Sequence, residues 1–192
     1  MTCIVSIIDK SNNKTYMAAD SIGVRGNDKS IQNNPKVFYN YHDPKFLIGF
    51  TSSFRMGQIL QYEFIPPKVN NIHTTSYYEM MRYMVQYFIP EVRDTFKTHG
   101  FIQSFEDGDE KGGLFMVAYE KYFYTIESDF FVSSVVDDYF SIGCGDVNAL
   151  GALYIMKNDN RISYKNKLIK ALYAAKYHST CVEEPFNVFE TK

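Results

Sequence analysis

The sequence has no tryptophan, and it has only three cysteines in 192 residues. Cys3, Cys144 and Cys181 share no CxxC spacing, and an odd number of cysteines cannot form a fully paired disulfide framework. We therefore expect a reducing compartment, in which the cysteines pack as small apolar side chains. The four histidines show no metal-ligand spacing either, so neither a metal site nor another cofactor is expected.

Long runs of one kind of residue are also missing. The net charge is −2 and no lysine or arginine cluster exceeds a few residues, so nucleic-acid binding through a basic face is not indicated. No apolar run approaches 18 residues, so no transmembrane helix is expected. No positive charge precedes Lys10, which argues against a signal peptide. Together these absences predict a cytoplasmic protein without a membrane partner.

Aromatic residues, in contrast, are abundant, with 16 tyrosines and 16 phenylalanines. Tyrosine in such numbers is typical of half-buried surfaces, such as packed layers or subunit interfaces. An A+T-rich genome would enrich the same residues without a physical cause. The length suits one domain spanning residues 1–192, with a sizeable core.

The first fifty residues predict strands in pairs. Apolar, β-branched residues at 3–9 and 15–21 predict a hairpin around a turn-forming DKSNNK. Residues 35–40 and 45–50 predict a second hairpin, and the polar stretch 23–34 between the two predicts a loop.

Helices are predicted next. Helical spacing extends over 52–64 and over 77–96, the second with Thr75 or Ser76 as its N-cap. Pro90 lies inside that second pattern, where it either kinks the helix or starts a new one.

In the second half of the chain, predicted strands are again followed by predicted helices. Residues 104–113 are acidic and glycine-rich, and predict a hairpin tip or surface loop. Residues 113–128 predict two strands, 146–157 and 164–178 predict helices, and 185–190 predicts a last strand. Runs of strands alternating with runs of helices indicate an α+β fold, with antiparallel sheets and helices packed outside them.

Thr2 stands directly before the first predicted strand. Its hydroxyl is a weak nucleophile unless a base removes the proton, and the α-amine of the same residue can do so once Met1 is removed. Methionine before a small residue such as threonine is the usual substrate for removal. Such a site also needs a nearby cation, an acid to orient that cation, and backbone N–H groups for an oxyanion.

Candidates for these roles lie at the ends of predicted strands. Asp20 ends the second strand, Lys36 begins the third, and the segment GFTSSF lies where the fourth strand gives way to a helix, whose backbone amides suit a negative charge. Each also has an ordinary interpretation: a strand-ending turn residue for Asp20 and a solvated strand-end lysine for Lys36. GCG before residue 146 is likewise typical of a plain turn with Asp146 as N-cap.

Five segments in order strengthen the catalytic interpretation: MTCIVSIID, YMAADS, NPKVF, FLIGFTSSFRMG and SIGCGDVNALGALY. Spread over about residues 2–155, they resemble the proteasome β-subunit and HslV-like family of N-terminal-nucleophile (Ntn) hydrolases, in its bacterial and phage forms. The resemblance implies a four-layer αββα sandwich.

It also implies roles for single residues. Thr2 would be the nucleophile, Asp20 and Lys36 the pair that tunes it, and the Ser53 amide the oxyanion donor. Cys144 falls where the family commonly has a serine beside the α-amine. The chain also departs from the family near residue 179, where Ser179 or Thr180 replaces an expected aspartate.

Three functions remain open on this basis. The first is a threonine peptidase acting on protein or peptide substrates, assembled as a homo-oligomeric ring with an ATP-dependent unfoldase as a possible partner. The second is a catalytically inactive structural or scaffolding subunit of the same fold, for example a phage component, that retains Met1. The third is a small-amide hydrolase.

Overall fold

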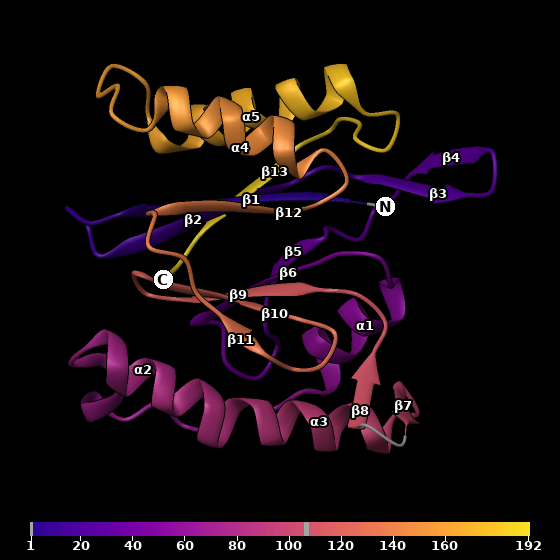
Figure 1. Cartoon of the computed structure of the whole chain (residues 1–192), viewed down its shortest axis with the longest axis vertical. Coiled ribbons are helices and arrows are strands. Elements are labelled where there is room, and N and C mark those ends of the chain that lie inside the picture. The colour runs from indigo at the N-terminus through magenta and orange to yellow at the C-terminus, as the bar shows by residue number, and fades with distance from the viewer. Residues whose placement is uncertain (1, 106–107) are drawn as a thin grey trace.

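The computed structural model describes residues 2–105 and 108–192. Over this part of the chain, two sheets are stacked face to face, and each carries helices on its outer side (Figure 1). This arrangement confirms the predicted α+β fold with αββα layers. In the described residues no helix is long and apolar enough to cross a membrane.

The upper sheet in Figure 1 contains the N-terminal strand. Its strand order is β12 (Tyr139–Gly143), β1 (Cys3–Asp9), β2 (Lys14–Ala19) and β13 (Asn187–Glu190), with every neighbour antiparallel. β1 is nearly continuous in apolar side chains because one face packs on the helices above and the other on the second sheet. β1 and β2 form the first predicted hairpin.

The lower sheet has the strand order β11 (Val132–Ser133), β10 (Tyr122–Ile126), β9 (Phe115–Tyr119), β6 (Phe46–Phe50) and β5 (Val37–Tyr39). β5 and β6 form the second predicted hairpin, and β9 and β10, which pair with each other, are the two strands predicted within 113–128. Between the two sheets, side chains of the upper sheet pack directly onto the backbone at Gly49, where a Cβ atom would lie 2.8 Å from Met17 Sδ and 2.9 Å from Ile4 Cδ1. Glycine at this position therefore lets side chains of the upper sheet pack against the lower one.

The helices α4 (Asp146–Met156) and α5 (Tyr164–His178) cover the upper sheet, as predicted. Gly145, with a φ of 79°, is the N-cap of α4, so the expectation of Asp146 in that position is wrong. Asp146 instead begins the helix, and its carboxylate accepts a hydrogen bond from the Val147 N–H. A left-handed residue turns the chain sharply into the helix here, which glycine tolerates without strain.

The outer face of the lower sheet is covered by α2 (Tyr77–Tyr83) and α3 (Ile89–Thr98), with α1 (Phe54–Gln58) at one end. Ser76 is the N-cap of α2, because its side chain accepts a hydrogen bond from Glu79 N–H.

Pro90 lies near the start of α3, and the residues before it, 84–88, form a π-helical turn that joins α2 to α3. Such a turn adjusts the hydrogen-bond ladder around a residue that cannot donate, so the chain remains helical through the proline.

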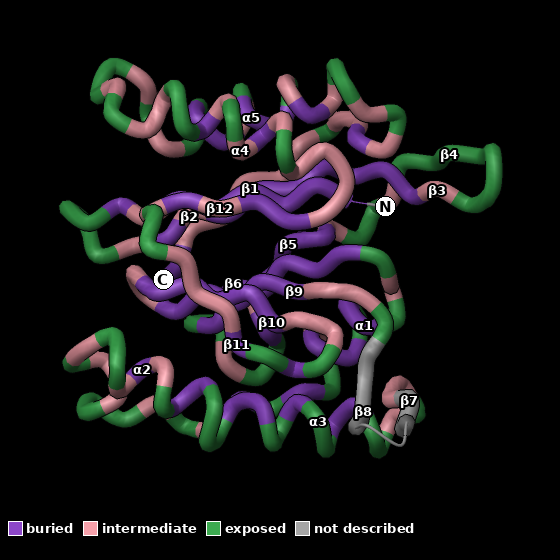
Figure 2. Tube along the Cα trace, viewed as in Figure 1, coloured by how far each residue is buried: buried purple, intermediate pink, exposed green. Residues whose placement is uncertain are grey.

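The polar stretch 23–34 is not simply a loop. It contains the hairpin β3 (Ile22–Arg25) and β4 (Asp28–Ile31), which projects beside the N-terminus (Figure 1). All residues of β4 are exposed, which is why its pattern lacks the apolar alternation of a half-buried strand (Figure 2). Within the acidic segment, β7 (Ile102–Phe105) pairs with β8 (Gly108–Lys111), and residues 106–107 lie outside the described part.

Candidate active site

Thr2 is buried, with 2% of its surface exposed, at the point where the chain enters β1. Both polar groups of the Thr2–Cys3 peptide are hydrogen-bonded. The Thr2 carbonyl accepts from the Cys144 N–H at 2.7 Å, and the Cys3 N–H donates to Asp20 Oδ1 at 2.8 Å. The peptide is thus held from two sides, which fixes the direction in which the N-terminal residue points.

Asp20 follows β2 directly and is fully buried. The register that pairs Ile4 with Ala19 brings its carboxylate beside the start of β1. Besides the Cys3 N–H, it accepts from the Ile22 N–H at 3.0 Å and from Lys36 Nζ at 2.8 Å, both on Oδ2. Three donors on one carboxylate compensate for its removal from water.

Lys36 comes from the other sheet, one residue before β5, and its side chain has no exposed surface. Burial lowers the pKa of its ammonium group below the ordinary value, and the attraction of Asp20 opposes that effect without cancelling it. The ion pair therefore places one positive charge in a low-dielectric environment next to the start of β1.

Gly143 and Cys144 form the third side of the site. Gly143 has a φ of 99°, and a Cβ atom there would lie 2.0 Å from the Thr2 carbonyl oxygen, closer than real atoms approach. A side chain at this position would push β12 away from Thr2, so glycine is required for the hydrogen bond from Cys144. Cys144 itself is half-buried.

The segment 51–53 lies against the same point. The methyl group of Thr51 would be 3.1 Å from a Cβ on Gly143. Ser52 has a φ of 69°, and the Ser53 N–H donates to the Thr51 carbonyl at 2.8 Å, which closes a tight γ-type turn. The Ser53 hydroxyl is the N-cap of α1, where it accepts from the Met56 N–H. In this conformation, the Ser53 amide is engaged with Thr51.

Cys3 is the other nucleophile candidate near Thr2. Burial, followed by the charge of Asp20, raises the pKa of its thiol well above the usual range. The thiolate is the reactive form of cysteine, so Cys3 is held in its inert form. The thiol packs with the apolar side chains under α4 and α5.

Ser179 ends α5 and lies next to Gly145, with its Cβ 3.4 Å from where a Cβ on Gly145 would be. Ser179, one of the two residues at the position where the resemblance leads us to expect an aspartate, is therefore adjacent to the Cys144 turn. Its hydroxyl accepts a hydrogen bond from the Cys181 N–H at 3.3 Å.

Two pockets differ in their relation to this site. One, of about 360 Å³, lies between the β3–β4 hairpin and Phe54 at the start of α1, and is bordered by Gly23 and Gln32. Gly23 follows Ile22, whose N–H binds Asp20, so this pocket adjoins the candidate site. Among the described residues, no group of three or more His, Cys, Asp or Glu side chains is placed to hold a metal ion.

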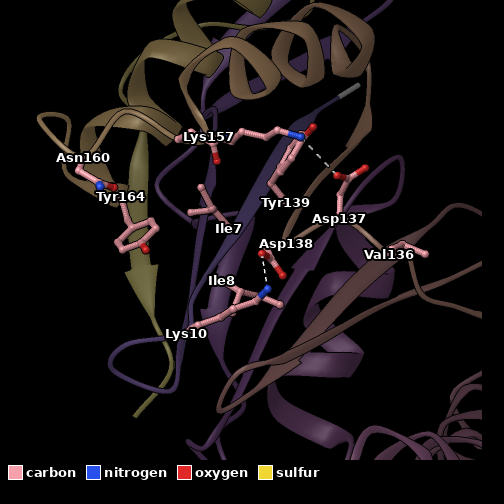
Figure 3. A pocket seen from close by; sticks show the side chains of 11 residues that line it. Ile7, Ile8, Lys10, Val136, Asp137, Asp138, Tyr139, Lys157, Asn160 and Tyr164 are labelled. Atoms are coloured by element: carbon pink, nitrogen blue, oxygen red, sulfur yellow. Dashed lines mark ion pairs between the residues drawn. The ribbon is translucent and has the colours of Figure 1, made fainter.

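The other pocket, of about 470 Å³, lies at the far end of β1 (Figure 3). Its ion pairs join Lys10 to Asp138 at 2.7 Å and Lys157 to Asp137 at 3.8 Å. Ile7, on its wall, is five residues beyond Thr2, or roughly 17 Å along an extended strand. This pocket is therefore separate from the candidate site.

The structure thus brings Thr2, Asp20, Lys36 and Cys144 together, and places Ser53 in the neighbouring turn. Sequence reasoning gave no separate role to Thr51, whose methyl group lies next to Gly143. Its position directly after the apolar run FLIGF was an available signal, because polar residues at strand ends often line sites.

The two stacked antiparallel sheets, with helices on both outer faces, have the fold of the proteasome-like Ntn hydrolases. The sequence matches no family model and no curated protein. The resemblance is found instead among solved structures.

BPH from Thiobacillus denitrificans, solved in complex with epoxomicin, superposes with a TM-score of 0.73 at 17% identity, covering 97% of this chain and 97% of that chain. Eukaryotic HslV from Trypanosoma brucei gives 0.68 at 15% identity, covering 98% of each chain. The Gly-1 mutant of Anbu from Hyphomicrobium sp. strain MC1 gives 0.61 at 13% identity, covering 98% of this chain and 80% of that chain. At these identities the likeness establishes the fold.

Proposed function

We propose that the protein is a threonine peptidase of the proteasome and HslV type, with Thr2 as its nucleophile after removal of Met1. The observation that carries the proposal is the buried Lys36–Asp20 ion pair, whose carboxylate also holds the N–H of the residue after Thr2. A fully buried charge pair is costly to build, and a hydrophobic pair would serve stability as well. Because Asp20 of this pair also binds the peptide between Thr2 and Cys3, we infer that the pair serves the chemistry of Thr2.

In the proposed reaction, the Thr2 hydroxyl oxygen attacks the carbonyl carbon of a substrate peptide bond. The free α-amine of Thr2 accepts the hydroxyl proton. The positive charge of Lys36 favours the deprotonated hydroxyl and the neutral amine, because a nearby cation disfavours a second positive charge. Asp20 keeps Lys36 charged and holds it in place.

The tetrahedral intermediate then collapses. The bond between the carbonyl carbon and the leaving nitrogen breaks, and the nitrogen takes the proton from the α-ammonium group, which leaves an ester on Thr2. A water molecule attacks this ester with the amine again acting as base, and the carboxylic acid product leaves as the Thr2 hydroxyl is restored.

The Ser53 amide is the proposed donor to the oxyanion. Because it donates to the Thr51 carbonyl in this conformation, it must exchange that bond for one to the substrate. Catalytic hydrogen bonds of this kind are often completed when substrate binds. Cys144 and Ser179 are proposed to position the α-amine, since they lie where the chain turns beside Thr2.

The proposed substrates are proteins or peptides, bound in an extended form with a side chain in the pocket beside Phe54. The chain is further proposed to act in the cytoplasm as a homo-oligomeric ring, with an ATP-dependent unfoldase as its partner. These proposals follow from the likeness to HslV-type structures.

The deciding experiment is the intact mass of the protein from a host with active methionine aminopeptidase, before and after incubation with epoxomicin, which BPH binds. We expect loss of the mass of one methionine, a further increase by one epoxomicin, and no epoxomicin adduct on a Thr2→Ala variant. A Thr2→Ser variant is the matched control, because it keeps both the hydroxyl and the amine, and we expect it to form the adduct.

Other results would contradict the proposal in distinguishable ways. Quantitative retention of Met1 would block the amine and make the chain a structural subunit of this fold. Removal of Met1, with hydrolysis of small amides but of no peptide in a panel, would make it a small-amide hydrolase instead.

A further inference from the structure

The pocket at the far end of β1 is lined by charges of both signs (Figure 3). Its volume of about 470 Å³ lies in the range of small-molecule sites. Its charged side chains form two ion pairs, Lys10 with Asp138 and Lys157 with Asp137. Because the signs balance, a multiply charged anion or cation would meet as many like charges as opposite ones, and the pocket favours neither.

The two ion pairs differ in how tightly they are closed. Lys10 Nζ lies 2.7 Å from Asp138 Oδ2, whereas Lys157 Nζ lies 3.8 Å from Asp137 Oδ1, which is too long for a hydrogen bond. Within the part of the chain that the structure describes, neither charged group of this second pair makes a hydrogen bond to another residue. The ammonium donors of Lys157 and the carboxylate oxygens of Asp137 therefore keep their capacity to bind a ligand.

Lys157 is nevertheless held in a defined position. Its carbonyl oxygen, at the end of α4, accepts a hydrogen bond from Nζ of the buried Lys167 at 2.9 Å. Its ammonium lies 4.7 Å from the ring centre of Tyr154 and 5.5 Å from that of Tyr139. Cation–π attraction to these rings orients the charge without using its N–H groups.

Asp137 also stands on an anchored backbone. The carbonyl oxygen of the next residue, Asp138, accepts a hydrogen bond from the Ile8 N–H at 2.7 Å, which extends the pairing of β12 with β1. Both charges of the open pair are thus placed before any ligand arrives. A site that is organised in advance loses less conformational entropy on binding.

We propose that this pocket binds a free α-amino acid with an uncharged polar side chain, such as glutamine. Its carboxylate binds Lys157 and its ammonium group binds Asp137. The 3.8 Å between Nζ and Oδ1 is close to the span from the ammonium nitrogen to the farther carboxylate oxygen of an α-amino acid. The four charges therefore alternate in sign around a square, and each ligand charge forms a charge-assisted hydrogen bond.

The opposite wall favours the uncharged polar side chain. In Figure 3, Asn160 and Tyr164 lie on the other side of Ile7 from Asp137. Burial, and then the charge of nearby carboxylates, raises the pKa of Tyr164, so its hydroxyl stays protonated and can donate. The amide of Asn160 can both donate and accept. An amide or hydroxyl side chain matches these groups, whereas a charged one would bring a charge without a counter-ion.

This inference rests on the pocket alone and not on the chemistry of Thr2. We expect a Thr2→Ala variant to bind the amino acid as the wild type does. Absence of an epoxomicin adduct, with amino-acid binding retained, would contradict the proposed peptidase and leave the amino-acid site supported. The two ideas therefore fail separately.

The test is isothermal titration calorimetry of the full chain with glutamine, for which we expect saturable binding at one site per chain. N-acetylglutamine lacks the ammonium group and glutaminamide lacks the carboxylate. Each should bind at least about tenfold more weakly, because each loses a hydrogen bond between charged groups. Glutamate and lysine, which carry an additional charge, should also bind more weakly than glutamine.

Two substitutions place the binding in this pocket. Lys157→Met and Asp137→Asn keep the size of the side chain and remove its charge, and each should weaken glutamine binding by about tenfold or more. Lys97→Met and Asp94→Asn are the matched controls, because both residues are exposed on α3, and we expect wild-type affinity. Circular dichroism confirms that each variant is folded.

Four results would overturn the proposal. They are the absence of saturable binding for every α-amino acid in a panel, equal binding of N-acetylglutamine and glutamine, and wild-type affinity in Lys157→Met. The fourth is binding of inorganic phosphate but of no amino acid, which would make the pocket a simple anion site. The ligand analogues are measured on the wild-type chain, so they decide the question even if a variant does not fold.

Discussion

Lys36 Nζ lies 2.8 Å from Asp20 Oδ2, with both side chains fully excluded from solvent; Asp20 follows β2 of the upper sheet, and Lys36 precedes β5 of the lower sheet. The pair therefore links the two layers of the sandwich at the end where Thr2 begins β1. Because Asp20 also binds the Cys3 N–H, any change in the pair is transmitted to the backbone of the candidate nucleophile.

Asp20→Asn should destabilise the protein strongly. The substitution keeps the shape of the side chain but leaves the Lys36 charge buried without its counter-ion, a change that costs about 3–5 kcal/mol of unfolding free energy. Urea titration at pH 7 measures this loss.

Asp138→Asn is the control for this prediction, because it breaks the exposed pair with Lys10, whose side chains are 44% and 72% exposed. Exposed pairs contribute less than about 1 kcal/mol. Equal losses in the two variants would show that the Lys36–Asp20 pair is not effectively buried in solution.

Gly143→Ala should lower the free energy of unfolding by more than about 3 kcal/mol. An alanine there would have an unfavourable φ of 99° and would also clash with the Thr2 carbonyl. Gly26→Ala provides the comparison, because Gly26 also has a positive φ, 58°, but has open space around it. We expect that variant to lose about 1 kcal/mol. If thermal unfolding shows the same shift for both, the close contact between β12 and Thr2 does not exist.

Much of this fold follows from local patterns in the sequence. The continuous apolar runs 3–9 and 45–50 and the helical spacing of 146–157 and 164–178 correspond to elements of the structure within one or two residues. These segments are buried on at least one face, so the spacing of their apolar residues indicates directly whether they form strands or helices.

The parts that could not be predicted depend on contacts far apart in the sequence. β4 is exposed along its whole length and therefore carries no apolar signal. The hydrogen bond from the Ser53 amide to the Thr51 carbonyl depends on the positive φ of Ser52. A serine rarely adopts this left-handed conformation, so it could not be predicted from the sequence. The proximity of Asp20 and Lys36 was inferred only through a family resemblance, because it requires the two sheets to be stacked.

Tyr124→Phe and Tyr83→Phe should have opposite effects on stability. Both tyrosines are buried, but the Tyr124 hydroxyl has no hydrogen-bond partner among the residues that the structure describes, whereas the Tyr83 hydroxyl donates to the Pro67 carbonyl at 2.5 Å. Removing an unpaired buried hydroxyl should raise the free energy of unfolding by about 1 kcal/mol, and removing a paired one should lower it by about 1 kcal/mol. The urea midpoints of unfolding of the two variants, compared with that of the wild type, show whether each substitution stabilises or destabilises the protein. A loss for Tyr124→Phe would mean that its hydroxyl has a partner in solution.

Stability should fall steeply above pH 10, and buried tyrosines should account for the fall. Burial raises the pKa of Tyr83 and Tyr124 far above the ordinary value of 10.0. In the folded state these side chains remain protonated while the unfolded chain releases their protons, so their contribution is complete below pH 10 and is lost as the pH rises further.

Above pH 10, each such tyrosine lowers the free energy of unfolding by about 1.4 kcal/mol for every pH unit. Lys36 acts in the opposite direction, because its folded-state pKa is lowered, but its effect ends once the unfolded lysine has lost its proton near pH 10.5. We therefore expect unfolding free energies measured between pH 9 and 11.5 to decline less steeply in Tyr124→Phe than in the wild type, and least steeply in the variant lacking both hydroxyls. Identical slopes in all three proteins would show that these two rings are accessible to hydroxide in the folded state.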